Sequence, residues 1–336
     1  MLIDKTREII DYHRHDEIYI RTDAVNVILN ILNTHSLAIV KGKPRSGKST
    51  LAMQVATEYQ DIGMPSIIFD QYEDFSRLIN CSNDQLAIVE DVFGKSKPRI
   101  IEDLHSRFLE RIRVCIKGKK TKVLITTRPL SEKFLETSIN TYMYIDPFQI
   151  VVDIDKGDQL SAPEKKAILK SYMKFYNITS FPTTKTFLNS INFFRGELFQ
   201  CELTSEQIKI ANEMFFDAVS ATETSIGFPF LCLQFCLQKR FRALGLSFFK
   251  NPHDAMLVDI DNIRKHGKID KDVRLQYSVL VFTALKKELN IDAIDRPLFQ
   301  LISKATYSIN YIDFSDQDIK DAAEDNVEYY LQFDED

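Results

Sequence analysis

The sequence of 336 residues lacks tryptophan, has no long apolar run and carries no strong excess of one charge. The longest apolar stretch, around Gly227–Leu237, is too short to cross a bilayer, and the charged N-terminus has no apolar signal core. With a net charge of −5, the chain has no general attraction to nucleic acid or anionic lipid. We therefore expect a soluble, cytoplasmic protein whose partners include neither a membrane nor a nucleic acid.

Cysteine and histidine occur without the spacing of metal sites. The five cysteines are scattered, and only Cys232 and Cys236 are close, at the i, i+4 spacing of one buried helix face. Structural zinc sites use close pairs such as Cys-x-x-Cys, which are missing here. The six histidines show no metal spacing either. We expect reduced, packed thiols, as is typical of intracellular proteins.

Apolar residues are abundant enough for a packed core, at 44% of the chain. Five short apolar runs predict strands at 36–40, 66–70, 86–90, 122–126 and 149–153. Helical patterns precede these runs over 1–30 and separate them over 48–60 and 99–117. Such alternation is typical of an α/β fold, a parallel sheet with helices on both faces, and it leaves the strand order open.

The pattern changes near residue 160, where helical segments replace the strands. Ser161, Pro163 and Glu164 are the cap signals of a helix that reaches about Asn177. Further amphipathic segments lie near 184–195, 204–221, 228–243, 253–265 and 271–288. We predict three regions: a sheet domain with a helical lead-in at 1–159, a helical lid at 160–250 and a mostly helical unit at 251–336.

A glycine-containing loop joins the first predicted strand to the next helix. It fits the P-loop pattern G-x-x-x-x-G-K-[ST] through Gly42, Lys43, Pro44, Arg45, Ser46, Gly47, Lys48, Ser49 and Thr50. Glycines allow a tight turn whose backbone N–H groups face phosphate oxygens, and the helix N-terminus adds partial positive charge. Lys48 is expected to reach the β- and γ-phosphates, Ser49 to ligate Mg²⁺, and Thr50 to assist. The loop therefore predicts a site for ATP or ADP with magnesium.

Acidic and polar residues follow the third and fourth predicted strands, at the edge of the sheet where ligands bind. By register, Glu90 takes the metal position and Asp91 the position of the catalytic base. Alternatively, Asp91 serves the metal and no base follows, because the next residue is apolar. After the fourth strand, Thr127 is expected to contact the nucleotide and Arg128 to supply positive charge to the transferred phosphoryl group. The predicted catalytic residues are thus Lys48, Asp91 and Arg128.

These elements, together with a later one, resemble the STAND class of signal-transduction NTPases, and most of all its third novel clade. The matching elements are the loop 42–50, Glu90-Asp91-Val-Phe-Gly94, Thr126-Thr-Arg128 and Gly227-Phe-Pro229. The similarity extends over roughly residues 18–290. The resemblance implies a P-loop NTPase core, a helical lid and a winged-helix-like C-terminal unit. It also implies that Pro229 contacts the nucleotide.

The resemblance further implies a switch in signalling or defence that self-associates in the ATP state and answers to a protein trigger or effector of unknown identity. Glu90 departs from the aspartate usual in the class, and sensor repeats are not visible. A scaffold that binds nucleotide but hardly hydrolyses it is therefore an alternative. A DNA-associated ATPase of the AAA+ kind is another, although residues 290–336 are acidic where such proteins present a basic helix. A nucleotide kinase would need an arginine-rich lid, which the sequence lacks.

Overall fold

The computed structural model describes residues 2–43, 45–92, 102–128, 146, 149–155, 160–178, 205–224, 226–286, 289, 294–307 and 314–327. The predicted loop residue Pro44 and the predicted amphipathic segment 184–195 lie outside these ranges. The chain forms two compact units, Met1–Lys250 and Asn251–Asp336. The sheet, the phosphate loop and the helices of the predicted lid all belong to the first unit.

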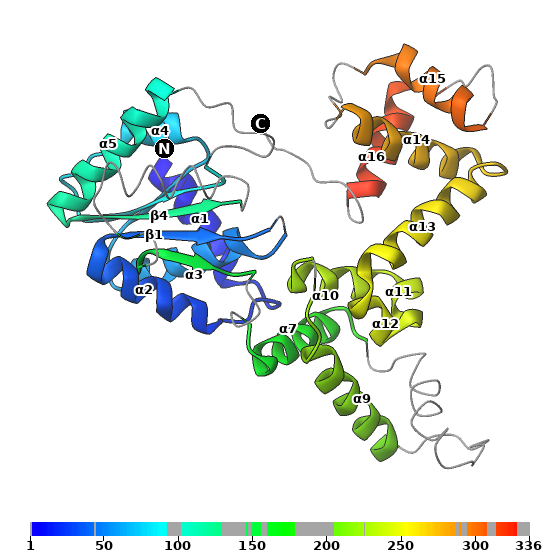
Figure 1. Ribbon diagram of the computed structural model, residues 1–336, viewed down its shortest axis with the longest axis horizontal. Helices are drawn as coiled ribbons and strands as arrows, with labels where there is room; N and C mark the ends of the chain where they lie inside the picture. The colour runs from blue at the N-terminus through cyan, green and yellow to red at the C-terminus, as the bar shows by residue number, and fades with distance from the viewer. Residues whose placement is uncertain are drawn as a thin grey trace. The chain divides into compact units, whose positions relative to one another are not determined.

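Within the described residues, five parallel strands form one sheet in the order β2-β3-β4-β1-β5. The strands are β1 (Leu37–Lys41), β2 (Ser66–Phe69), β3 (Gln85–Val89), β4 (Thr121–Thr127) and β5 (Val151–Asp153). All are close to the predicted runs, so the predicted α/β fold is confirmed (Figure 1). The strand order, which the sequence left open, places β1 between β4 and β5.

Helices cover both faces of the sheet because successive strand residues point to opposite sides. On one face, Ala38 and Val40 of β1 pack in a core with residues of α1 (Leu2–Arg14), α2 (Asp23–His35) and α3 (Lys48–Asp61). On the other face, Leu37 and Ile39 of the same strand pack with α4 (Tyr72–Leu78) and α5 (Glu102–Gly118). Both cores are fully buried, which accounts for the continuous apolar runs of the strands.

The predicted helical lead-in over 1–30 is wrong for residues 15–22, which connect α1 to α2 without helical structure. The backbone amide of Ile18 donates to Asp16 Oδ1 at 2.9 Å, a side-chain turn that competes with the helix. A new helix then begins at Asp23, after the extended N-cap residue Thr22. The non-helical segment between the two helices forms part of the candidate site.

The described residues of the first unit after β5 are mostly helical, and aromatic residues pack between the helices. The helices described here are α7 (Ala162–Phe175), α9 (Ser205–Ser220), α10 (Phe228–Leu237), α11 (Lys239–Leu244) and α12 (Leu246–Lys250). The start of α7 carries a reciprocal capping box between Ser161 and Glu164. Phe215, Phe235 and Phe249 pack with ring centroids 5.0 to 6.4 Å apart. The aromatic residues therefore serve as core.

In the second unit, every element that the structure describes is a helix. These are α13 (Pro252–His266), α14 (Lys271–Lys286), α15 (Arg296–Tyr307) and α16 (Asp316–Val327). Phe282 of α14 stacks on Phe299 of α15 with ring centroids 4.7 Å apart, at the centre of a separate apolar core. The second unit thus has the mostly helical character predicted for residues 251–336.

The cysteines differ from the expectation of reduced thiols. Cys81 and Cys115, 34 positions apart in the sequence, form a disulfide. Their spacing gave no signal, because only the packing of the connection after α4 against the end of α5 brings them together. Cys232 and Cys236 are free and buried in α10, as their spacing predicted. Among the described helices, none has the length and apolar character needed to span a membrane.

Candidate functional site

The predicted phosphate loop begins at the carboxyl edge of the sheet, which we define as the edge where β1, β3, β4 and β5 end. Lys41, the last residue of β1, is level with Thr127 of β4 and Asp153 of β5. The loop then leaves the sheet, with the Gly42 amide donating to the Thr127 carbonyl at 3.2 Å. Parallel pairing thus brings the ends of three strands to the start of the loop.

The loop has the backbone that its glycine pattern predicts. Gly47 has φ of 93° and is the N-cap of α3, so a side chain at this position would be strained. Lys48, the first residue of that helix, is largely buried and donates from Nζ to the carbonyls of Gly42 at 2.9 Å and Lys43 at 2.7 Å. Burial lowers the pKa of the Lys48 ammonium. Its charge therefore lies directly across the loop.

Glu90 follows β3 and faces the start of α3. Its backbone amide donates to Phe69 in β2 at 3.0 Å, which extends the sheet by one residue. Burial raises the pKa of the Glu90 carboxyl, and a hydrogen bond with Ser49 partly offsets this effect. Its Oε1 atom is buried and has no hydrogen-bond partner in the described part of the chain. Hydroxyl and carboxylate oxygens are ligands that Mg²⁺ takes in proteins, so Ser49 and Glu90 fit a magnesium site.

Asp91 and Arg128 form a bidentate ion pair at the same edge. Arg128 Nε lies 3.1 Å from Asp91 Oδ1 and its terminal nitrogen lies 2.8 Å from Asp91 Oδ2. The two side chains are only 26% and 20% exposed, respectively, so the pair is more than a solvated surface contact. The charges of both residues influence the pKa of Lys48, which lies nearby. Asp91, the predicted catalytic base, and Arg128, the residue predicted to contact the transferred phosphoryl group, are thus bound to each other.

Asp155, which was not predicted as a site residue from the sequence, binds the start of the phosphate loop. The Lys43 amide donates to Asp155 Oδ2, two residues after β5 ends. Burial raises the pKa of the Asp155 carboxyl, and the hydrogen bond from Lys43 opposes this effect. In β5 itself, Asp153 pairs with the buried ammonium of Lys41 at 2.9 Å. The acidic residues at the end of the fifth predicted strand are the sequence feature that could have indicated these contacts.

A mostly apolar pocket lies beside the loop and was also missed. It combines the non-helical segment between α1 and α2, the loop, the start of α3, the residue after β5 and the helix α7. The lining includes Ile18, Tyr19, Ile20, Gly47, Thr50, Leu51, Ile154, Leu160, Ile168, Tyr172 and Pro229. The Tyr19 hydroxyl is buried without a hydrogen-bond partner among the described residues. An apolar pocket with few polar groups is typical of a small-molecule site.

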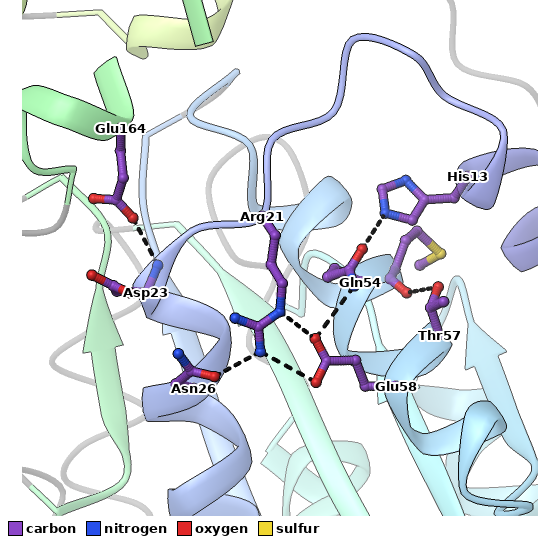
Figure 2. Close-up of polar contacts among 9 residues, drawn as sticks. His13, Arg21, Asp23, Asn26, Gln54, Thr57, Glu58 and Glu164 are labelled. Carbon is purple, nitrogen blue, oxygen red and sulfur yellow. Dashed lines mark hydrogen bonds and ion pairs between the residues drawn. The ribbon is translucent and has the colours of Figure 1, made fainter. Parts of the chain in front are cut away.

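Polar contacts fix the wall of this pocket to the helices around it (Figure 2). Arg21 donates to Glu58 of α3, with Nε 2.6 Å from Oε1, and to Asn26 of α2 at 2.6 Å. The Asp23 amide donates to Glu164 Oε1 at 2.7 Å, which joins α2 to the capped start of α7. The segment between α1 and α2 is thus attached through Arg21 to α2 and α3, and the start of α2 is joined to α7.

Gly227 and Pro229 lie against the phosphate loop. A Cβ atom on Gly227 would be 2.2 Å from the Arg45 carbonyl oxygen, so no other residue fits this approach. The Arg45 guanidinium in turn lies 4.2 Å from the ring centroid of Phe230. Pro229 lines the pocket together with Gly47. The position of Pro229 is compatible with the nucleotide contact implied by the resemblance.

The structure brings most of the predicted site residues together. Gly42 to Gly47, as far as described, form the loop, and Lys48 and Ser49 begin α3. Thr50 lines the pocket, and Glu90, Asp91 and Arg128 stand at the neighbouring strand ends. Thr127 is buried at the end of β4, and its hydroxyl has no partner within the described ranges. The structure described contains no group of three or more histidine, cysteine or acidic side chains that could hold a metal ion.

The parallel sheet and the loop between β1 and α3 define the class: a P-loop NTPase module. Residues 19–175 match the family model described as Novel STAND NTPase 3. The resemblance to the third novel STAND clade is thereby confirmed for this part of the chain. No curated protein sequence matches the chain.

The solved structures that match this chain include three of low sequence identity. AMPPCP-bound DnaA from Aquifex aeolicus is 13% identical, with a TM-score of 0.37 over 73% of this chain and 89% of that chain. PCH-2 from C. elegans is 12% identical, with a TM-score of 0.38 over 75% and 69%. A DNA replication initiation factor is 12% identical, with a TM-score of 0.37 over 92% and 88%. These similarities are too remote to indicate function.

Proposed function

We propose that this chain binds ATP with magnesium and hydrolyses it slowly, as a STAND-type switch in signalling or defence. One observation carries the proposal. Lys48, Asp91 and Arg128 converge at the carboxyl edge of the sheet, beside a loop whose pattern is specific for polyphosphates. Chance convergence of this kind is improbable, because the three residues come from three separate elements.

The phosphate contacts follow from the charges at this edge. Lys48 transfers its hydrogen bonds from the loop carbonyls to the β- and γ-phosphates, whose negative charge is the stronger acceptor. Ser49 and Glu90 are the residues that would hold Mg²⁺, which when bound neutralises phosphate charge. The apolar pocket that includes Pro229 takes the base and ribose.

The hydrolytic step uses Asp91 as the base. Its carboxylate accepts a proton from water while the water oxygen bonds to the γ-phosphorus. The bond between this phosphorus and the bridging oxygen to the β-phosphate breaks, and ADP and inorganic phosphate leave. Arg128 first exchanges its ion pair with Asp91 for the γ-phosphate, where it stabilises the transferred phosphoryl group. This exchange explains why the turnover we propose is slow.

The switch follows from contacts between the loop and the helical region. Gly227 approaches the Arg45 backbone, and Glu164 at the start of α7 is joined to Asp23 at the start of α2. A nucleotide between these elements changes both contacts, and hydrolysis reverses the change. The ATP state then exposes a surface for self-association, and a protein trigger or effector acts on this equilibrium.

A second candidate function is a nucleotide-binding scaffold with hardly any turnover. The ion pair between Asp91 and Arg128 favours it, because the bidentate contact occupies both carboxylate oxygens that an attacking water would have to reach. The glutamate in place of the usual aspartate at position 90 points in the same direction. The two candidates share the binding site and differ only in the chemical step.

Calorimetry and steady-state phosphate release distinguish these functions. We expect Mg-ATP and Mg-ADP to bind, the parent to release phosphate steadily, and Asp91→Asn to bind ATP as well as the parent but release no phosphate. Asp84→Asn, directly before the start of β3, is the matched control and should keep full turnover. Binding without turnover in the parent supports the scaffold, and no heat of binding from a folded sample rejects both candidates. Light scattering in ADP and in a non-hydrolysable ATP analogue tests self-association.

A further inference from the structure

Asp91 has an unusual backbone for an acidic residue at a strand end. Its φ is 41°, in the left-handed region that non-glycine residues rarely adopt. Such a conformation persists only where the surroundings enforce it, and it is frequent at functional sites. The ion pair with Arg128 holds the carboxylate, but it does not hold the backbone. Something else keeps this turn in place.

Thr126, in β4, supplies that restraint with two hydrogen bonds. Its hydroxyl Oγ1 accepts from the Asp91 amide at 2.8 Å, and its carbonyl accepts from the Val92 amide at 3.0 Å. The pairing of β3 with β4 ends one step earlier, at Val89 and Ile125. A side-chain oxygen therefore continues the bonding between the strands where the backbone of the acidic turn departs from the sheet.

The placement of Thr126 is itself rigid. The residue is 1% exposed and is paired with Val40 in β1, the strand that enters the phosphate loop. Its β-branched side chain has few accessible rotamers in a strand, so the hydroxyl stays where the Asp91 amide needs it. Thr126 thus links the acidic turn to the strand that leads into the phosphate loop.

We propose that Thr126 is a positioning residue, whose hydroxyl holds Asp91 in its left-handed conformation and aims the carboxylate at the attacking water. The inference depends on the function proposed above. It matters most when Arg128 has moved to the γ-phosphate, because the ion pair then no longer restrains Asp91. The hydrogen bond to the Asp91 amide is the contact that stays.

Two substitutions at position 126 distinguish the effect of the hydroxyl from the effect of the side chain's shape. Thr126→Val keeps the β-branched shape and removes the acceptor, whereas Thr126→Ser keeps the acceptor. We expect Thr126→Val to lower kcat for ATP by about tenfold or more, the size of effect that a small displacement of a catalytic group produces. The KM for ATP and the Kd for ADP should stay within about twofold of the parent, and Thr126→Ser should restore kcat.

A control and a second measurement make the test decisive. Thr121→Val, at the far end of β4, removes a buried hydroxyl and should leave kcat unchanged. Hydrogen exchange of the Asp91 amide, followed by NMR, should be faster in Thr126→Val and unchanged in Thr126→Ser. An unchanged exchange rate, or an unchanged kcat in an active Thr126→Val protein, overturns the proposal. A parent without turnover overturns the proposed hydrolysis instead, and the exchange rates still decide whether Thr126 holds the turn.

Discussion

Particular buried polar side chains at the two edges of the sheet differ in whether they are hydrogen-bonded. At the amino edge, where β3 and β4 begin, Gln85 donates to the Asn80 carbonyl at 2.6 Å and Thr121 to the Asn83 carbonyl at 3.0 Å. At the carboxyl edge, Ser46 Oγ, Glu90 Oε1 and Thr127 Oγ1 are buried without a hydrogen-bond partner among the residues described. The side chains of the first residues of β3 and β4 are therefore bonded, whereas three buried oxygens at the carboxyl edge are not.

This difference between the edges distinguishes residues that stabilise the fold from residues that serve function. An unsatisfied buried polar group costs about 1–3 kcal/mol, so a chain under selection for stability alone would not collect three of them. In the function proposed above, a polyphosphate and its magnesium ion would supply the missing partners at the carboxyl edge. The left-handed residues Arg45 and Asp91 lie at this edge as well. The amino edge, with the disulfide between Cys81 and Cys115 beside it, is built to hold the fold.

The largest effect expected from this comparison concerns lysine. Lys48→Ala removes the charge across the loop and should raise the Kd for ATP by roughly 100-fold, because hydrogen bonds to charged groups contribute about 1.5–3 kcal/mol. Lys122→Ala, at the amino edge, removes a lysine that donates to Ser36 Oγ at 3.2 Å and should leave the Kd within about twofold. Isothermal calorimetry measures both. Equal affinities in the two variants would contradict the division between the edges.

A smaller effect is expected for two threonines of the same strand. Thr121→Val loses a satisfied hydroxyl and should lower the free energy of unfolding by about 1–2 kcal/mol, with no change in ATP affinity. Thr127→Val removes a buried hydroxyl that lacks a partner in the described chain, so its unfolding free energy should stay the same or rise while ATP affinity falls. Urea unfolding without nucleotide measures the unfolding free energies of both variants. A Thr127→Val protein less stable than Thr121→Val would refute the contrast.

The smallest effect is a pH dependence of opposite sign at two glutamates. Burial raises the folded pKa of Glu90, so its contribution to stability is present below the ordinary value of 4.5 and is lost as the pH rises through the folded pKa. Hydrogen bonding to Arg21 lowers the folded pKa of Glu58, so its contribution is present above 4.5 and is lost as the pH falls through the folded pKa.

Glutamine substitutions expose these two contributions. At neutral pH and without nucleotide, Glu90→Gln should be more stable than the parent and Glu58→Gln less stable, each by about 1 kcal/mol or less. The Glu90→Gln difference should shrink as the pH falls toward 4.5, whereas the Glu58→Gln difference should persist down to 4.5 and shrink below it. Urea unfolding at several pH values measures them. The same sign for the two variants at neutral pH would show that Glu90 is an ordinary ion-paired carboxylate.

Much of the site could be predicted because its parts are short and local. The loop 42–50 and the strand ends with Glu90, Asp91 and Arg128 need only a run of apolar residues followed by residues of a given kind. Parallel strands then bring these ends to one edge, whatever the strand order. The break in the N-terminal helix was missed, since local turn bonds such as the one from the Ile18 amide to Asp16 Oδ1 form there while helical spacing continues on both sides.

The sequence by itself determined the class of fold, the phosphate-loop pattern and the kinds of side chain at the strand ends, because each depends on neighbours within a few positions. Only the tertiary structure decided the strand order, the pocket beside the loop, the contact of Lys43 with Asp155 and the pairing of Cys81 with Cys115. These features join segments far apart in the chain. Their partners are chosen by packing and by the pairing of buried polar groups, which no local spacing records.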